Sequence, residues 1–172
     1  EDTLSLHDAL PIYVGSFSFG AGDGGYLLFL GRIHPDKGTH VAIEVARRTK
    51  LPLIIAGVVH DADYHEREVV PHVDGTSVRY VGPVGHQARD RLLGGALGLL
   101  HLIDFAEPFG LSVVESLATG TPVVAFRRGS MPELLRDGLT GFLVDDVDAA
   151  VGAVRGLSRL DRRACRGDAE RR

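Results

Sequence analysis

Short apolar runs alternate with helix-compatible segments along most of this chain, and this alternation constrains the fold more than any other feature. The first run, YLLFLG (26–31), is followed after Gly38 by THVAIEVARR, whose apolar residues have helical spacing. The later runs, each followed by a segment compatible with a helix, are PLIIAG (52–57), SVRYVG (77–82), LGLLHLI (97–103), TPVVAF (121–126) and GFLV (141–144). This alternation predicts a doubly wound α/β fold with a parallel sheet of about six strands.

The composition fits one globular domain and narrows the partners. The chain has 172 residues, of which 44% are hydrophobic, and a formal net charge of -4, which gives no reason to expect a nucleic acid partner. The single cysteine, Cys165, excludes an intramolecular disulfide and a cysteine zinc site, so we expect a reducing, cytoplasmic location. No apolar run approaches the roughly 18 residues of a transmembrane helix, which leaves peripheral membrane contact open.

The N-terminal stretch is interpreted separately from the domain. Residues 3–12, TLSLHDALPI, look like the translation, in one reading frame, of a common sequencing-library adapter. We therefore interpret residues 1–24 as adapter-like sequence and linker, and residues 25–172 as a domain truncated at both ends. An ordinary amphipathic start to the domain is the alternative.

The turn after the first apolar run carries two cations. It reads GRIHPDKG, and ligands of such sheets bind beyond the carboxyl ends of the strands. Gly31 permits close backbone approach, while Arg32 offers a planar fork and Lys37 a compact charge, a pair that suits a pyrophosphate. The alternative is that both cations are solvated, or that Asp36 pairs with one of them. The spacing matches neither a Walker loop nor G-x-G-x-x-G.

Two glutamates bracket the segment EPFGLSVVE, which follows the fourth apolar run. Pro108 suits an early helical position, so the next amides should be free to bind an anion. Glu115 lies four residues beyond Leu111, about 6 Å along a helix axis, on a polar stripe with Ser112, Ser116 and Thr119. A carboxylate at that distance can accept both hydroxyls of a ribose. The alternative is a helix-dipole role for Glu107 and a solvent-facing Glu115.

Taken together, these motifs resemble the C-terminal half of a GT-B glycosyltransferase of the retaining family 4. The matching segments between Tyr26 and about Val154 are GRIHPDKG, EPFGLSVVE, GTPVVAF, GSMPEL and DGLTGFLV. The resemblance implies a Rossmann-like domain that forms one half of a GT-B fold. It also implies transfer of a hexose from a nucleoside-diphosphate sugar to an acceptor, with no metal and no other cofactor.

The resemblance also implies a role for each site residue. Arg32 and Lys37 would hold the diphosphate, Glu107 the transferred sugar and Glu115 the ribose. The base would pack near the turn 81–83, which composition alone marks as core packing. The expected catalytic residues are Glu107, Arg32 and Lys37. The expected donor-binding residues are Gly31, Arg32, Lys37, Val81, Gly82, Glu107, Phe109, Gly110, Leu111 and Glu115.

Several consequences and alternatives follow from the resemblance. One Rossmann-like half leaves the N-terminal acceptor domain missing, so we expect the isolated chain to bind a nucleotide sugar without transferring it. A nucleotide-sugar epimerase on the same scaffold and a non-catalytic nucleotide-binding module remain alternatives. A phosphorylase would need a pyridoxal-phosphate lysine, and only Lys37 and Lys50 are present. For His34, His60 and His101, which sit by strand ends, we predict ordinary polar or core roles.

Overall fold

The computed structural model describes residues 12–172, so nearly all of the adapter-like stretch lies outside the described residues. Its centre is one parallel six-stranded sheet with the strand order β3-β2-β1-β4-β5-β6. The strands are β1 (Leu27–Leu30), β2 (Leu53–Ala56), β3 (Val78–Gly82), β4 (Gly98–His101), β5 (Val123–Phe126) and β6 (Gly141–Val144). Each lies within one of the six apolar runs, which confirms the predicted α/β fold.

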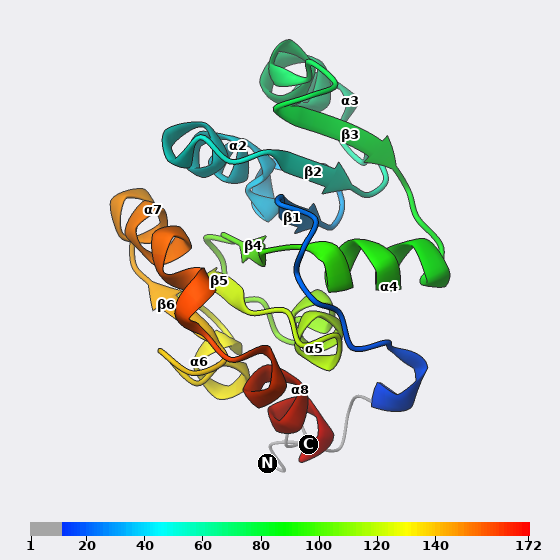
Figure 1. Cartoon of the computed structure of the whole chain (residues 1–172). Coiled ribbons are helices and arrows are strands. Elements are labelled where there is room, and N and C mark those ends of the chain that lie inside the picture. Colours follow the sequence, from blue (N-terminus) through cyan, green and yellow to red (C-terminus); the bar gives the residue numbers. More distant parts are fainter. Residues whose placement is uncertain (1–11) are drawn as a thin grey trace, which may run out of the picture.

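Helices cover both faces of this sheet (Figure 1). Helices α2 (Thr39–Thr49) and α7 (Val147–Gly156) pack together on one face, whereas α4 (His86–Gly95), α5 (Leu111–Ala118) and α8 (Arg162–Glu170) lie on the other. The remaining helical segments are short. They are η1 (Val14–Ser16), η2 (Pro35–Lys37), α3 (Ala62–Tyr64), η3 (His65–Val69), η4 (Val70–His72), α6 (Met131–Leu134) and η5 (Leu157–Arg159).

Alternate residues of the strands other than β3 enter two separate cores. On β1, Leu27 and Phe29 contribute to the core under α2 and α7, while Leu28 contributes to the core under α5 and α8. The same alternation places Leu100 and Leu99 of β4 in the two cores. Because the central strands are buried on both sides, their sequences are continuous apolar runs.

Residues 13–25, interpreted as a loop or linker, lie along the face that carries α4, α5 and α8. They contain the short helix η1, and Phe17 is buried in the second core. The Gly20 amide donates to the Thr119 carbonyl at 2.9 Å, and Arg166 of α8 donates to the Phe17 carbonyl at 2.7 Å. This segment is therefore packed against the domain.

The helical segment between β2 and β3 is not one continuous helix. It is divided into α3, the π-helical η3 and the 3-10 turn η4, and it ends near Pro71, which has no amide to donate.

In the C-terminal segment, α8 buries Cys165 completely, and burial raises the pKa of its thiol to about 12. No helix among residues 12–172 is long and apolar enough to cross a membrane.

Candidate functional site

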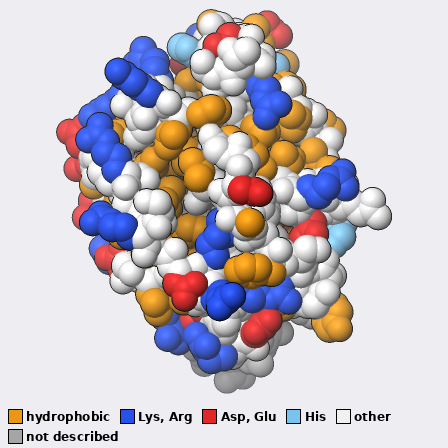
Figure 2. Space-filling model, in the orientation of Figure 1, with side chains coloured by type: hydrophobic (Ala, Val, Ile, Leu, Met, Phe, Trp, Pro, Cys, Tyr) orange, Lys and Arg blue, Asp and Glu red, His pale blue; other side chains and the backbone are white. Residues whose placement is uncertain are grey.

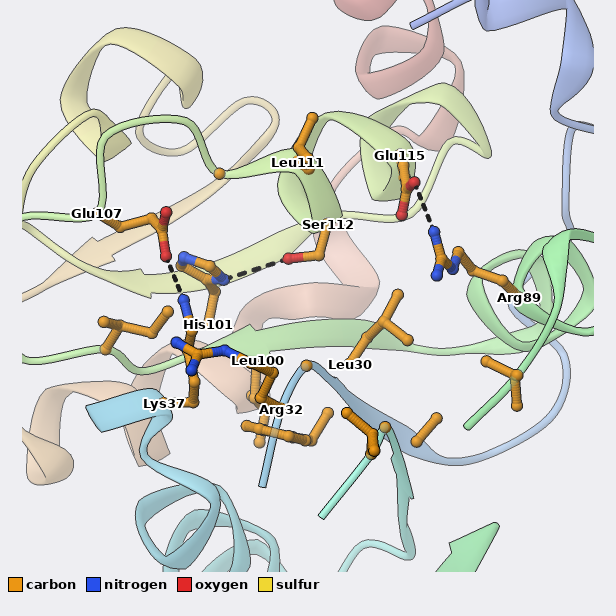
Figure 3. Close-up of a pocket in the computed structure, with 18 of the residues that line it drawn as sticks. Leu30, Arg32, Lys37, Arg89, Leu100, His101, Glu107, Leu111, Ser112 and Glu115 are labelled. Atoms are coloured by element: carbon orange, nitrogen blue, oxygen red, sulfur yellow. Dashed lines mark hydrogen bonds and ion pairs between the residues drawn. The ribbon is translucent and has the colours of Figure 1, made fainter. Parts of the chain in front are cut away.

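A cavity of about 470 Å³ opens at the carboxyl ends of β1, β2 and β4. Strands β1 and β4 are neighbours in the sheet although they are not consecutive in the chain, so the strand order reverses there. Open α/β sheets bind their ligands at such a switch point. Figure 3 shows the charged side chains that line the cavity from different elements.

The turn after β1 brings both predicted cations to the cavity. Gly31, Arg32 and Lys37 all line it. Arg32 is half-exposed and lies 3.5 Å from a carboxylate oxygen of Asp36, so one of the two cations does pair with this aspartate. The Lys37 ammonium is largely buried, lies 5.1 Å from the centroid of the Phe105 ring and donates to Glu107 Oε2 at 2.5 Å. Lys37 is therefore not a solvated loop cation.

Glu107 is fixed through its backbone as well as through its side chain. The amide and the hydroxyl of Ser130 both donate to the Glu107 carbonyl, each at 2.9 Å. A Cβ atom at Gly129, whose φ is 56°, would lie 2.4 Å from the Glu107 nitrogen. The turn GSMPEL therefore holds the backbone of Glu107 in place.

Burial by itself would raise the pKa of the Glu107 carboxyl. The hydrogen bond and the charge of Lys37 outweigh this effect, with help from His101 and the Phe109 amide, so that the pKa lies below its ordinary value. The carboxylate is therefore held in its ionised form beside an ammonium. Phe109, Gly110 and Leu111 also line the cavity.

Helix α5 starts later than its sequence predicts. Pro108 precedes the helix, which begins at Leu111, because Gly110 takes the left-handed conformation with a φ of 61° and acts as the N-cap. The first amides of α5 have no partner within the helix, and Gly110, Leu111 and Ser112 line the cavity. The helix N-terminus therefore lies at the cavity, but it begins at Leu111 and not near Pro108.

Glu115 faces the cavity and is mostly buried, with 14% of its side chain exposed. This contradicts the interpretation of a solvent-facing residue. The polar stripe assigned to it is also wrong in part, because Ser116 and Thr119 are fully buried and donate to the carbonyls of Thr121 and Ser116. The reason is that α4 and α8 cover α5 on both sides.

Arg89 of α4 is a site residue that sequence reasoning missed. Its guanidinium donates from Nη1 to Oε1 of Glu115 at 2.9 Å, and both residues line the cavity. Burial raises the pKa of Glu115 above its ordinary value, whereas the charge and hydrogen bond of Arg89 oppose the rise. Nothing local in the sequence marks Arg89, because its partner is set by the packing of α4 on α5.

His101 also lies at the cavity, and its burial agrees with the core role predicted for it. It ends β4, lines the cavity and is 7% exposed, and Figure 3 shows its ring between Glu107 and Ser112. The Ser112 hydroxyl lies 3.5 Å from Nδ1, while the buried Nε2 has no hydrogen-bond partner among the described residues. Burial lowers the pKa of His101 to about 4, so the ring is neutral at pH 7.

The base of the nucleotide was expected near the turn 81–83, and only part of this turn lines the cavity. Val81 and Gly82 end the edge strand β3, and Val81 is 44% exposed. Neither is among the residues that line the cavity, whereas Pro83 and Val84, just beyond them, are. The edge position of β3 leaves Val81 pointing to solvent, and the chain reaches the cavity only after the strand ends.

Charged side chains line the cavity, whereas the face of the molecule in Figure 2 carries acidic, basic and hydrophobic side chains. In Figure 2, acidic and basic side chains are interspersed, and hydrophobic side chains gather mostly nearer the centre of this face. Within residues 12–172 no group of three or more His, Cys, Asp or Glu side chains is arranged to hold a metal ion. The arrangement can offer cations and free amides to an anion, and carboxylates to hydroxyl groups, within one cavity.

The fold and the site together define a class of protein, a Rossmann-like domain with a charged cavity at its switch point. The chain belongs to the family "Glycosyl transferases group 1", whose model matches residues 17–165. It is 32% identical over 146 residues to the D-inositol 3-phosphate glycosyltransferase of Nocardioides sp., covering 73% of this chain and 32% of that protein. It is 33% identical over 146 residues to the glycogen synthase of Mycobacterium tuberculosis, covering 78% and 34%. The chain therefore spans about a third of the length of these relatives.

Several solved structures share the fold. AviGT4, a glycosyltransferase involved in avilamycin A biosynthesis, matches with a TM-score of 0.76 and 26% identity, over 94% of this chain and 54% of that one. HepE of Anabaena in complex with UDP matches with a TM-score of 0.72 and 21% identity, over 87% and 45%. The expected Rossmann-like domain of GT-B type and the resemblance to a glycosyltransferase family are thereby confirmed.

Proposed function

We propose that this chain is the donor-binding half of a retaining family 4 glycosyltransferase that transfers a hexose from a nucleoside-diphosphate sugar. The observation that carries the proposal is the convergence of four charged residues on one cavity. They come from the turn after β1 and from the two ends of EPFGLSVVE, and they are Arg32, Lys37, Glu107 and Glu115. The crystallisation of HepE with UDP, and of the same protein with UDP-glucose, supports the choice of ligand.

In this proposal, the two cations and the two glutamates bind different parts of the donor. Arg32 and Lys37 stabilise the negative charge of the diphosphate, together with the free amides at the start of α5. Glu107 accepts hydrogen bonds from the hydroxyls of the transferred sugar, and Glu115 accepts those of the ribose. The base lies toward the turn after β3, where Pro83 and Val84 offer apolar contacts.

The chemistry follows from this placement. The bond between sugar C1 and the diphosphate oxygen breaks, and its electrons leave with the nucleoside diphosphate. The acceptor oxygen bonds to C1 from the same face, and its proton passes to the departing phosphate. The cations lower the barrier because the negative charge on the leaving group grows during the step. Glu107 and Glu115 are positioning groups in this scheme and do not form an acid and base pair.

An acceptor half outside this sequence would complete the enzyme, in keeping with the third of the relatives' length that the chain spans. We therefore propose that the chain alone binds the donor without transferring its sugar. Turnover by the isolated chain with any donor and acceptor would contradict this part. The single buried cysteine supports the proposed cytoplasmic location.

Binding of nucleotides to the chain tests the proposal directly. We expect one of UDP, GDP and ADP to raise the melting temperature, and NAD to have no effect. Arg32→Ala and Glu115→Ala should each abolish the shift, whereas Arg47→Ala should retain it, because Arg47 pairs with Glu44 on α2 away from the cavity. The proposal is wrong if no nucleotide binds, or if both cavity variants bind as well as the unmodified chain.

A further inference from the structure

Arg89 approaches Glu115 from the neighbouring helix. The guanidinium is carried by α4, and its Nη1 donates to Oε1 of the carboxylate at 2.9 Å. Figure 3 shows this pair on the far side of Ser112 from the Lys37–Glu107 pair. The cavity therefore has two separate ion pairs, and that of Arg89 lies at the end where the proposed function places the ribose.

The environment of Glu115 does not favour ionisation without a partner. Burial is the largest influence on the pKa of Glu115, which it raises. Among the described residues, the charged and titratable groups that act against this rise are Arg89 and, more weakly, His86, both on α4. Without the guanidinium, the pKa of Glu115 would rise further.

The protonation state of the Glu115 carboxyl decides how many hydrogen bonds it can accept. An ionised carboxylate accepts up to about four hydrogen bonds, of which Arg89 uses one, so acceptors remain for both hydroxyls of a ribose. A protonated carboxyl must place one donor and has fewer acceptors. A carboxylate without the guanidinium would also be free to rotate away from the cavity.

We propose that Arg89 is the positioning residue for ribose recognition, holding Glu115 ionised and oriented so that the site binds ribonucleotides in preference to 2′-deoxyribonucleotides. This inference rests on the proposed function, because the ribose contact of Glu115 is part of it. Arg89 itself touches the carboxylate and not the sugar.

Titration calorimetry with UDP, GDP and ADP and with their 2′-deoxy counterparts tests the inference. The unmodified chain should bind one ribonucleotide about tenfold or more tightly than its deoxy form, as expected for a hydrogen bond to a charged group. Arg89→Met should lose most of this preference while its affinity for the deoxy form stays the same. Arg89→Lys should restore part of the preference, since it keeps the positive charge.

The dependence on pH separates a positioning role from a merely structural one. In Arg89→Met the pKa of Glu115 is raised further, so the loss of ribonucleotide affinity on acidification should begin at a higher pH than in the unmodified chain. The affinity for the deoxy form should show no such difference between the two proteins. Melting curves confirm that each variant is folded.

Other outcomes identify which idea fails. If no nucleoside diphosphate binds to the unmodified chain, the proposed function is wrong and the inference falls with it. If one binds and Arg89→Met keeps the ribose preference, only the role of Arg89 is refuted. A folded Arg89→Met could instead lose the same affinity for the ribonucleotide and for its 2′-deoxy counterpart at every pH. That result would also refute the positioning role, because it would show that Arg89 contacts the base or the phosphates directly.

Discussion

Protonation of His101 should make the domain sensitive to mild acid. Burial lowers the pKa of this imidazole from 6.5 to about 4, with Glu107 acting against the shift and Lys37 adding to it. The ring is therefore neutral in the folded chain at a pH where the unfolded chain already binds a proton. A group with a lowered pKa of this kind favours unfolding as the pH falls below 6.5.

The magnitude follows from the two pKa values. The full shift corresponds to about 3 kcal/mol of lost stability below pH 4, and about 2 kcal/mol is lost between pH 8 and pH 5. We expect His101→Asn, which keeps a polar group near Ser112, to lose about 2 kcal/mol less than the unmodified chain over the same interval. Urea unfolding at pH 8 and at pH 5 measures both differences.

A matched variant and a direct titration control this experiment. His72 is exposed and lies away from the cavity, so His72→Asn should show the acid sensitivity of the unmodified chain. The reasoning is refuted if His101→Asn loses as much free energy of unfolding as the unmodified chain between pH 8 and pH 5. An NMR titration that gives His101 an ordinary pKa in the folded protein would refute it as well.

Three further substitutions test the packing and the site. Phe17→Ala should cost about 3 kcal/mol in urea unfolding, because the ring is buried in the second core; a cost below about 0.5 kcal/mol would mean that its segment is not part of the fold. Gly129→Ala should destabilise by about 1–3 kcal/mol more than Gly138→Ala: both have positive φ, but only at Gly129 would the new Cβ meet backbone, 2.4 Å away. Equal costs would contradict this. Lys37→Met should weaken nucleotide binding about tenfold or more by calorimetry, whereas Lys50→Met, remote from the cavity, should not; equal effects would contradict the site.

The central strands were predictable because they are continuous apolar runs buried on both faces of the sheet, whereas the edge strand β3 is partly exposed. The charged residues after β1 and around the start of α5 were predictable for a related reason, since strand ends in a parallel sheet meet at one edge. Arg32, Lys37, Glu107 and Glu115 all line the cavity as a result. Their roles toward a ligand remain predictions.

The features that the sequence did not reveal depend on contacts between distant segments. Ser116 and Thr119 look like a polar stripe, yet the neighbouring helices bury both, and their hydroxyls donate to nearby backbone carbonyls, so the burial leaves no hydroxyl unpaired. Arg89 acquires its partner only through the packing of two helices. The late start of α5 depends on the left-handed conformation of Gly110, which the preceding proline made hard to foresee.

The charges at the cavity are balanced within the protein before any ligand is considered. Two ion pairs line the cavity, Lys37–Glu107 and Arg89–Glu115, and Arg32, which also lines it, pairs with Asp36 beside it. Pairing explains how a partly buried site holds so many ions, because an unpaired buried charge would destabilise the fold. It also argues that simple attraction between net charges does not select the ligand. Recognition must instead come from order along the cavity, with cations for an anionic centre and carboxylates for hydroxyl groups on both sides. A sugar nucleotide has that order, and an isolated inorganic phosphate does not.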